Sequence, residues 1–198
     1  MKYDCLLVGV GGQGVLSVAA VIARSAAKIG CSVRQSEVHG MAQRGGAVLA
    51  HLRIAGQGEA IYGDLVPRGS ADLIIAMEPL ESLRYLAWLS PEGMVVSSAD
   101  NLINIPNYPE KAAIEKAIKS LPKSSLINAE ELAREAGMAK TVNMVMVGAA
   151  SSFLPIPADI LESTIAEMFV EKDPKFAELN KKAFSLGRAA NSSLDNNP

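Results

Sequence analysis

Near its start the chain reads Leu6-Leu7-Val8-Gly9-Val10-Gly11-Gly12-Gln13-Gly14-Val15, an apolar run that leads into a glycine-rich turn. Gly9, Gly11 and Gly14 stand in the G-x-G-x-x-G register that joins the first strand of a Rossmann-like fold to its first helix. The first glycine allows a tight turn, the second lets phosphates approach the backbone, and the third lets helix and strand pack closely. The helix N-terminus adds free N–H donors and a positive dipole, so the stretch predicts a phosphate-binding loop.

Hydrophobic periodicity and turn residues predict the elements on either side of this loop. We predict strands at residues 3–10, 32–37, 47–54, 71–77, 93–98 and 125–128. We predict helices at residues 13–29, 79–89, 109–121, 129–136, 143–153, 158–169 and 173–190. A turn at Gly56-Gln57-Gly58 is expected to let residues 59–62 fold back as a hairpin arm, and Pro91-Glu92-Gly93 predicts a further turn.

These elements indicate an α/β fold class: a three-layer Rossmann-like open sheet, mostly parallel with an antiparallel hairpin arm, and a helix-rich C-terminus. A chain of 198 residues is long enough to bury a full core. We expect a single domain over residues 1–190 and a polar tail over residues 191–198.

Composition narrows the class of protein. Hydrophobic residues make up 49% of the chain, aromatic residues 5%, and the formal net charge is -2. Near-balanced charge and few aromatic rings exclude a basic or stacking surface for nucleic acid. We find neither a signal peptide nor an apolar run long enough for a membrane span, and therefore expect a cytoplasmic protein without a membrane partner.

The two cysteines, Cys5 and Cys31, do not form a Cys-x-x-Cys pair. We interpret them as small thiols packed in a reducing compartment. The chain itself is therefore not expected to hold a zinc ion or an iron–sulfur cluster.

The glycine loop alone leaves its ligand open. A NAD site is expected to carry an acidic residue about twenty positions after the last glycine, to bind the ribose hydroxyls. That position holds Arg34, and Glu37 lies slightly further on. Because an arginine suits a 2′-phosphate, an independent NADP-binding oxidoreductase, or a flavin-binding one, remains an alternative.

A second polar cluster follows the second predicted strand. Glu37, His39, Gln43 and Arg44 supply an acid, an imidazole, an amide and a guanidinium, and Gly40, Gly45 and Gly46 allow tight turns between them. Carboxyl ends of strands meet at one edge of an open α/β sheet, so we expect this cluster beside the glycine loop. Arg44 would then meet a phosphate or carboxylate, although a solvated loop with an Arg–Glu pair is the simpler alternative.

The other polar residues have structural explanations. Glu78 and Glu81 flank a helix start, where carboxylates complement the dipole, and Asn143 is expected to cap a helix. His51 is interpreted as a hydrogen-bonded structural histidine. Neither a catalytic triad nor metal-ligand spacing can be recognised, so no catalytic residue and no metal site is assigned.

Together, the glycine loop and the segment Glu37-Val38-His39-Gly40-Met41-Ala42-Gln43-Arg44-Gly45-Gly46 resemble the gamma-type subunit of 2-oxoacid:ferredoxin oxidoreductases. The pyruvate-type members carry an acidic-Arg-Arg-Gly element in the second loop. Here Ala42-Gln43-Arg44-Gly45-Gly46 stands instead, which is similar to the beta subunit of the indolepyruvate type. The similarity extends through Gly69–Ala76 and Glu78 to Asn143 and Gly148.

The resemblance implies oxidative decarboxylation of an aryl 2-oxoacid, with coenzyme A as co-substrate, to acyl-CoA, CO2 and reduced ferredoxin. It also implies that thiamine diphosphate and the iron–sulfur clusters belong to a large partner subunit, so that this chain would be inactive alone. Eleven residues are expected to line the shared cleft: Gly9, Gly11, Gly12, Gln13, Gly14, Glu37, His39, Gln43, Arg44, Gly45 and Gly46. The isolated chain could self-associate through the surface meant for its partner. A non-enzymatic binding module is the remaining alternative.

Overall fold

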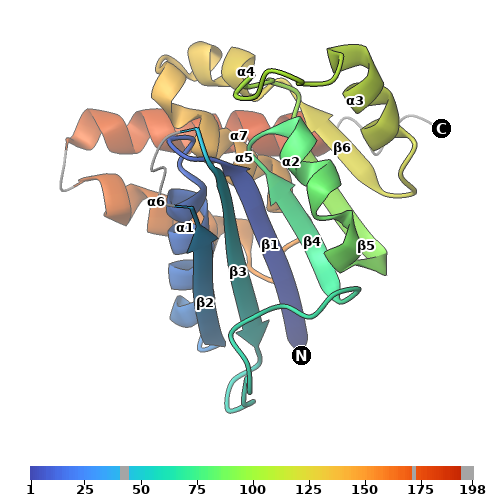
Figure 1. Ribbon diagram of the computed structural model, residues 1–198. Helices are drawn as coiled ribbons and strands as arrows, with labels where there is room; N and C mark the ends of the chain where they lie inside the picture. The colour runs from blue at the N-terminus through green and yellow to red at the C-terminus, as the bar shows by residue number, and fades with distance from the viewer. Residues whose placement is uncertain (41–44, 171–172, 193–198) are drawn as a thin grey trace.

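The computed structural model describes residues 1–40, 45–170 and 173–192, which form a six-stranded sheet between two layers of helices (Figure 1). The strands are β1 (Lys2–Val10), β2 (Ser32–His39), β3 (Ala47–Ala55), β4 (Ala71–Ala76), β5 (Leu89–Ser98) and β6 (Ser124–Ile127). Their order in the sheet is β2-β3-β1-β4-β5-β6. The β1–β4, β4–β5 and β5–β6 pairs are parallel, and β3 is antiparallel to both β1 and β2. The predicted three-layer α/β fold is therefore confirmed.

After β1 the chain continues toward one edge of the sheet, and after β4 it continues toward the opposite edge. After β1 it passes through α1 (Val15–Lys28) toward β2, and after β4 it passes through α2 (Pro79–Arg84) to β5. Right-handed connections place α1 behind the sheet in Figure 1, and α2 and α3 (Lys111–Lys119) in front of it. The adjacent carboxyl ends of β1 and β4 therefore form the topological switch point, where open α/β sheets bind ligands.

The sheet contains antiparallel pairing as predicted, but the antiparallel strand is β3, which pairs with β1 and β2. Residues 59–62 do not form a strand, and Tyr62 among them is 94% exposed. β3 is hydrogen-bonded to β2 along one edge and to β1 along the other. No edge of β3 is free to pair with residues 59–62, so the proposed hairpin arm was wrong.

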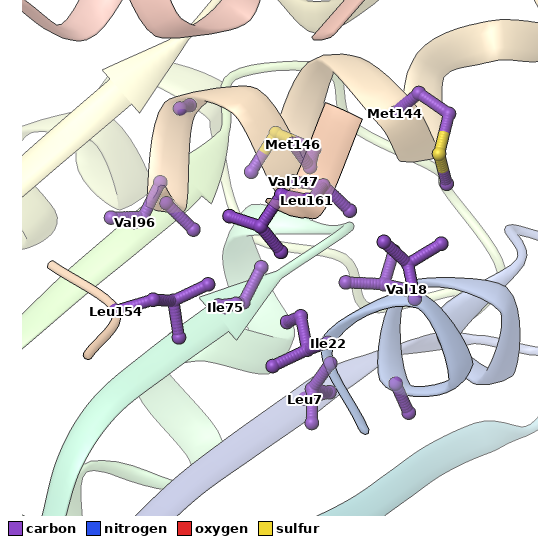
Figure 2. Close-up of a cluster of buried hydrophobic side chains, with 14 of the residues drawn as sticks. Leu7, Val18, Ile22, Ile75, Val96, Met144, Met146, Val147, Leu154 and Leu161 are labelled. Carbon is purple, nitrogen blue, oxygen red and sulfur yellow. The ribbon is translucent and has the colours of Figure 1, made fainter. Parts of the chain in front are cut away.

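The main core lies between the sheet and the helices behind it. Besides α1, these helices are α4 (Ala129–Ala136), α5 (Val142–Ala150), α6 (Ala158–Val170) and α7 (Pro174–Ser192). Figure 2 shows Leu7 and Ile75 of the sheet facing Ile22 of α1 and Val147 of α5. Every α5 residue from Met144 to Ala150 is buried, as expected for a helix that is apolar on all sides.

Two glycines allow α5 and α7 to approach at backbone distance. A Cβ atom added at Gly148 would lie 2.0 Å from the carbonyl oxygen of Phe184, and one added at Gly187 would lie 2.0 Å from that of Val145. Ordinary side chains cannot fit in these gaps, so the contact depends on glycine at both positions.

A smaller core lies in front of the sheet, where residues 56–70 cross its face. Val66 is buried in this core, and its N–H donates to Nδ1 of His51 (3.1 Å). Arg53 binds Asp4 through two hydrogen bonds of 2.8 and 3.0 Å, and it also donates to the carbonyl of Gly63 (3.1 Å). The structural role predicted for His51 agrees with this geometry. Burial, together with nearby Arg53, lowers the pKa of its imidazole.

Several element boundaries differ from the predictions. The expected turn Pro91-Glu92-Gly93 lies inside β5, where the register against β4 shifts between Ala71 and Leu73. The predicted helix 79–89 is divided into α2 and a 3₁₀ turn, η1 (Leu86–Trp88), and a second 3₁₀ turn, η2 (Ala139–Thr141), precedes α5. α7 includes the first two residues of the predicted tail, and residues 193–198 lie outside the described part of the chain. None of the described helices is both long enough and apolar enough to cross a membrane.

Candidate functional site

The glycine loop joins the end of β1 to the start of α1 at the switch point. Gly14 is the N-cap residue of α1 and has a left-handed conformation, with φ of 82°. Gly12 also has a positive φ, 104°, and the space where its side chain would project is empty out to 4 Å. Both conformations favour glycine, and the open space at Gly12 lets a ligand approach the backbone.

Gly9 serves packing rather than ligand access. A Cβ atom at this position would lie 2.9 Å from Met77 Cβ and 2.9 Å from Val15 Cγ2. The first glycine of the motif therefore lets the end of β1 lie against the end of β4 and the first residue of α1. This is the close packing that the motif predicts, although the motif assigns it to its third glycine.

The side chain of Gln13 fastens the loop to the sheet. Its Oε1 accepts a hydrogen bond from the N–H of Val10 (2.8 Å), and its Nε2 donates to the carbonyl of Met77 (3.2 Å). The amide thus connects the ends of β1 and β4. Gln13 fixes the shape of the loop, and its backbone N–H also closes a turn onto the carbonyl of Val10 (3.1 Å).

The loop between β2 and β3, here called the second loop, contacts the glycine loop through its last residues, Gly45 and Gly46. The N–H of Gly11 donates to the carbonyl of Gly46 (2.8 Å), and the N–H of Gly45 donates to the carbonyl of Gly11 (3.3 Å). Gly45 has a φ of 78°, which again favours glycine. The two motifs, separated in sequence, are therefore joined by backbone hydrogen bonds, as the shared sheet edge suggested.

Of the remaining residues of the second cluster, the structure describes Glu37 and the backbone of His39. Glu37 is exposed on β2 opposite Ala50, on the face of the sheet that carries α1. The backbone of His39 ends β2, and its side chain is outside the described part of the structure. Gln43 and Arg44 also lie outside the described residues. Their predicted contribution to the site stays a prediction.

Arg34 does not lie near the glycine loop. It is the third residue of β2, so at about 3.3 Å per residue it lies roughly 16 Å from the end of that strand. Its guanidinium forms an exposed ion pair with Asp64 (3.0 Å). The cation required for a 2′-phosphate is therefore engaged elsewhere, which weakens the NADP alternative.

Sequence reasoning missed a buried polar group at the end of β4. Glu78 is 1% exposed and is the N-cap residue of α2, where Oε2 accepts the N–H of Glu81 (3.0 Å). Its other oxygen accepts a hydrogen bond from the hydroxyl of Tyr108 and a longer one from the N–H of Leu102 (3.4 Å). Burial and the contact with Glu78 raise the pKa of Tyr108, which keeps the phenol protonated as a donor. The sequence showed only a carboxylate at a helix start.

Two asparagines complete the surroundings of the loops. Asn104 Nδ2 donates to the carbonyl of Gly45 (2.8 Å), and Asn143 Nδ2 lies 3.2 Å from where a Cβ atom of Gly14 would be. Asn143 is not the cap that was predicted, because α5 begins one residue earlier at Val142 and Thr141 occupies the N-cap position. The signal that could have located these residues is their place after β5 and at the start of α5, both expected near the carboxyl edge of the sheet.

The assembled site offers hydrogen-bond donors, not an evident reactive group. Backbone N–H groups at the start of α1 and in glycine turns bind anions such as phosphates. Cys5 is buried in β1, and burial raises its pKa well above the ordinary value, so its thiol is protonated and inert. Among the described residues, none group as three or more His, Cys, Asp or Glu side chains able to hold a metal ion.

Comparison with known proteins supports the resemblance found in the sequence. Indolepyruvate oxidoreductase subunit IorB of Thermococcus kodakarensis is 37% identical over 195 residues, covering 94% of each chain. The protein of the same name from Methanothermobacter thermautotrophicus is 38% identical over 197 residues, covering 96% of this chain and 98% of its own.

Solved structures show the same fold at lower identity. A 2-oxoglutarate:ferredoxin oxidoreductase from Magnetococcus marinus matches 97% of this chain and 31% of its own, with a TM-score of 0.75 and 20% identity. Pyruvate oxidoreductase subunit PORC from Thermotoga maritima matches 96% of both chains, with a TM-score of 0.71 and 20% identity. The family model described as pyruvate ferredoxin/flavodoxin oxidoreductase matches residues 4–190. The chain therefore belongs to the pyruvate ferredoxin/flavodoxin oxidoreductase family.

Proposed function

We propose that this protein is the subunit without thiamine of an indolepyruvate-type 2-oxoacid:ferredoxin oxidoreductase. The observation that carries the proposal is the 36–38% identity to four indolepyruvate oxidoreductase subunits over almost the whole chain. The assembled enzyme would convert an aryl 2-oxoacid and coenzyme A to acyl-CoA and CO2, passing two electrons to ferredoxin. Thiamine diphosphate and the iron–sulfur clusters would be held by the large partner subunit.

The chain's own part in this reaction would be to form one wall of the coenzyme A cleft. Coenzyme A carries three phosphate groups, which suit the anion-binding N-terminus of α1 and the open backbone at Gly12. The second loop, held against the first by the bonds between Gly11 and Gly45-Gly46, would bring Arg44 to the same cleft. A guanidinium binds phosphate through paired hydrogen bonds.

The test uses the complex of this chain with its large subunit, assayed by viologen reduction with indolepyruvate. In Arg44→Glu we expect the KM for coenzyme A to rise about 10- to 100-fold, because a hydrogen bond to a charged group contributes roughly 1.5–3 kcal/mol. Arg24→Glu, a matched charge reversal at an exposed position of α1, should leave that KM unchanged. An Arg44→Glu complex with the coenzyme A affinity and turnover of wild type would contradict the proposal.

The alternative, an independent NADP- or flavin-binding oxidoreductase, makes a different prediction. It requires the isolated chain to bind NADPH or FMN at micromolar concentration. Arg34, the residue that kept this alternative open, is paired with Asp64 away from the loop. Titrating the isolated chain with NADPH, FMN and coenzyme A, followed by fluorescence or calorimetry, separates the two functions.

A further inference from the structure

The segment between β5 and α3 is held in place along much of its length. Asp100 accepts hydrogen bonds from the hydroxyl of Ser98 (2.8 Å) and from the N–H of Glu130 in the first turn of α4 (2.8 Å). Further along, the N–H of Leu102 and the hydroxyl of Tyr108 both donate to Glu78. We call residues 99–108 the clamp loop, because these contacts anchor it to two helices at the carboxyl edge of the sheet.

Glu78 does more in the structure than cap a helix. Capping α2 requires one acceptor, and Oε2 provides it. The other oxygen, Oε1, accepts hydrogen bonds from Leu102 and Tyr108 of the clamp loop. The Tyr108 hydroxyl in turn accepts a hydrogen bond from Asn101 Nδ2 (2.9 Å), so its own proton is directed to Glu78. A carboxylate this deeply buried is costly unless its oxygens are satisfied, so this bonding defines where the clamp loop lies.

Asn104, midway along the clamp loop, reaches the second loop. Its Nδ2 donates to the carbonyl of Gly45, whose own N–H donates to Gly11. Gly45 is therefore bound from both sides: by the clamp loop and by the glycine loop. Asn104 is only partly buried, so this hydrogen bond is not required to satisfy a fully buried group.

We infer that Asn104 is a positioning residue for the coenzyme A cleft: anchored by Glu78 and Tyr108, it holds the Gly45-Gly46 backbone at the distance from the glycine loop that the ligand requires. This inference rests on the proposed function, in which the two loops share one ligand. The clamp loop then borders the cleft together with the glycine loop and the second loop. Its effect on coenzyme A binding is exerted through the position of Gly45, and it takes no part in the chemical step.

The test measures steady-state kinetics of the complex with the large subunit, with coenzyme A and indolepyruvate varied in turn. In Asn104→Ala we expect the KM for coenzyme A to rise about three- to tenfold, the range of a single net hydrogen bond, with kcat and the KM for indolepyruvate unchanged. Asn128→Ala is the matched control: Asn128 is exposed, follows β6 at the same sheet edge, and makes no side-chain capping hydrogen bond. It should match wild type.

Tyr108→Phe provides a second variant, at another residue of the clamp loop. Loss of its hydroxyl removes one anchor of the clamp loop, so the KM for coenzyme A should rise again. The double variant Asn104→Ala/Tyr108→Phe should be no worse than Asn104→Ala alone, because both changes act on Gly45 through one contact.

The outcomes separate the inference from the proposed function. If the wild-type complex shows no saturable dependence on coenzyme A, the proposed function fails. If it does, but Asn104→Ala retains the wild-type KM for coenzyme A, the inference fails. Parallel changes in kcat and in both KM values, with a lower thermal midpoint, would also overturn it, since they indicate a general loss of structure.

Discussion

The close approach of α5 and α7 yields a quantitative stability prediction for Gly148→Ala. The added Cβ atom would lie 2.0 Å from the carbonyl oxygen of Phe184 and 2.9 Å from the backbone nitrogen of Arg188. Restoring an ordinary contact of 3.4 Å requires a displacement of about 1.4 Å between two helix backbones, which cannot rotate away as a side chain could.

Overpacking of this kind costs about 3 kcal/mol or more, and the better helix propensity of alanine returns about 1 kcal/mol. We therefore expect a net loss of at least about 2 kcal/mol in the free energy of unfolding. For a chain of this length, that lowers the thermal midpoint by about 4–8 °C. Urea denaturation followed by circular dichroism measures the loss directly.

Gly63→Ala is the matched control. A Cβ atom at Gly63 would meet only Arg53 Nη1, at an ordinary 3.7 Å, and Gly63 does not have a positive φ. Its free energy of unfolding should stay within about 0.5 kcal/mol of wild type or rise slightly, because alanine restricts the unfolded chain. If Gly148→Ala unfolds at the same urea concentration as Gly63→Ala, the backbone contact between α5 and α7 is not as described.

Two further predictions concern the front of the sheet. In Asp4→Asn the mostly buried Arg53 loses its charged partner, and we expect a loss of about 3 kcal/mol in the free energy of unfolding, measured by urea denaturation; a loss below about 1 kcal/mol would refute it. Because burial lowers the pKa of His51 below 6.5, the unfolded state binds the proton more readily, so the stability that His51 contributes is present above that pH and is lost as the pH falls below it. Urea midpoints of wild type and His51→Gln, compared between pH 7.5 and 5.5, should show a steeper acid loss in wild type, and parallel curves would contradict this assignment.

Much of the fold could be predicted because its signals are local. The apolar run before Gly9, the glycines that follow it and the periodicity of α1 are readable from the sequence alone, as is the alternation in β3. What sequence could not show was the direction of β3, since an alternating strand reads alike in both orientations. It also could not show that β3 would be paired on both edges, which excluded residues 59–62 from the sheet.

For the candidate site, the sequence predicted that the two glycine-bearing segments would meet, but it did not predict the side-chain contacts around them. Glycine motifs at strand ends locate a site by topology, and Gly11 and Gly45-Gly46 do meet. Glu78 accepts hydrogen bonds from Leu102 and Tyr108, and Gln13 donates to the carbonyl of Met77, which directly follows β4. Because these partners are distant in sequence, the motif identified Gln13 as a candidate site residue but could not predict that its side-chain amide binds Met77.

The antiparallel placement of β3 has a consequence for how this site can change. Residues 40–46 connect β2 to β3. The register of β3 is fixed by its long pairing with β2, which begins at His39↔Val48, and by its long pairing with β1, which begins at Val10↔Ala47. Lengthening such a connection costs little, about 0.6 kcal/mol for each doubling of its length. Under the proposed function, insertions and substitutions before Gly45 would alter the residues that line the coenzyme A cleft while the sheet keeps its register. The hairpin therefore gives the fold a segment in which specificity can diverge independently of stability.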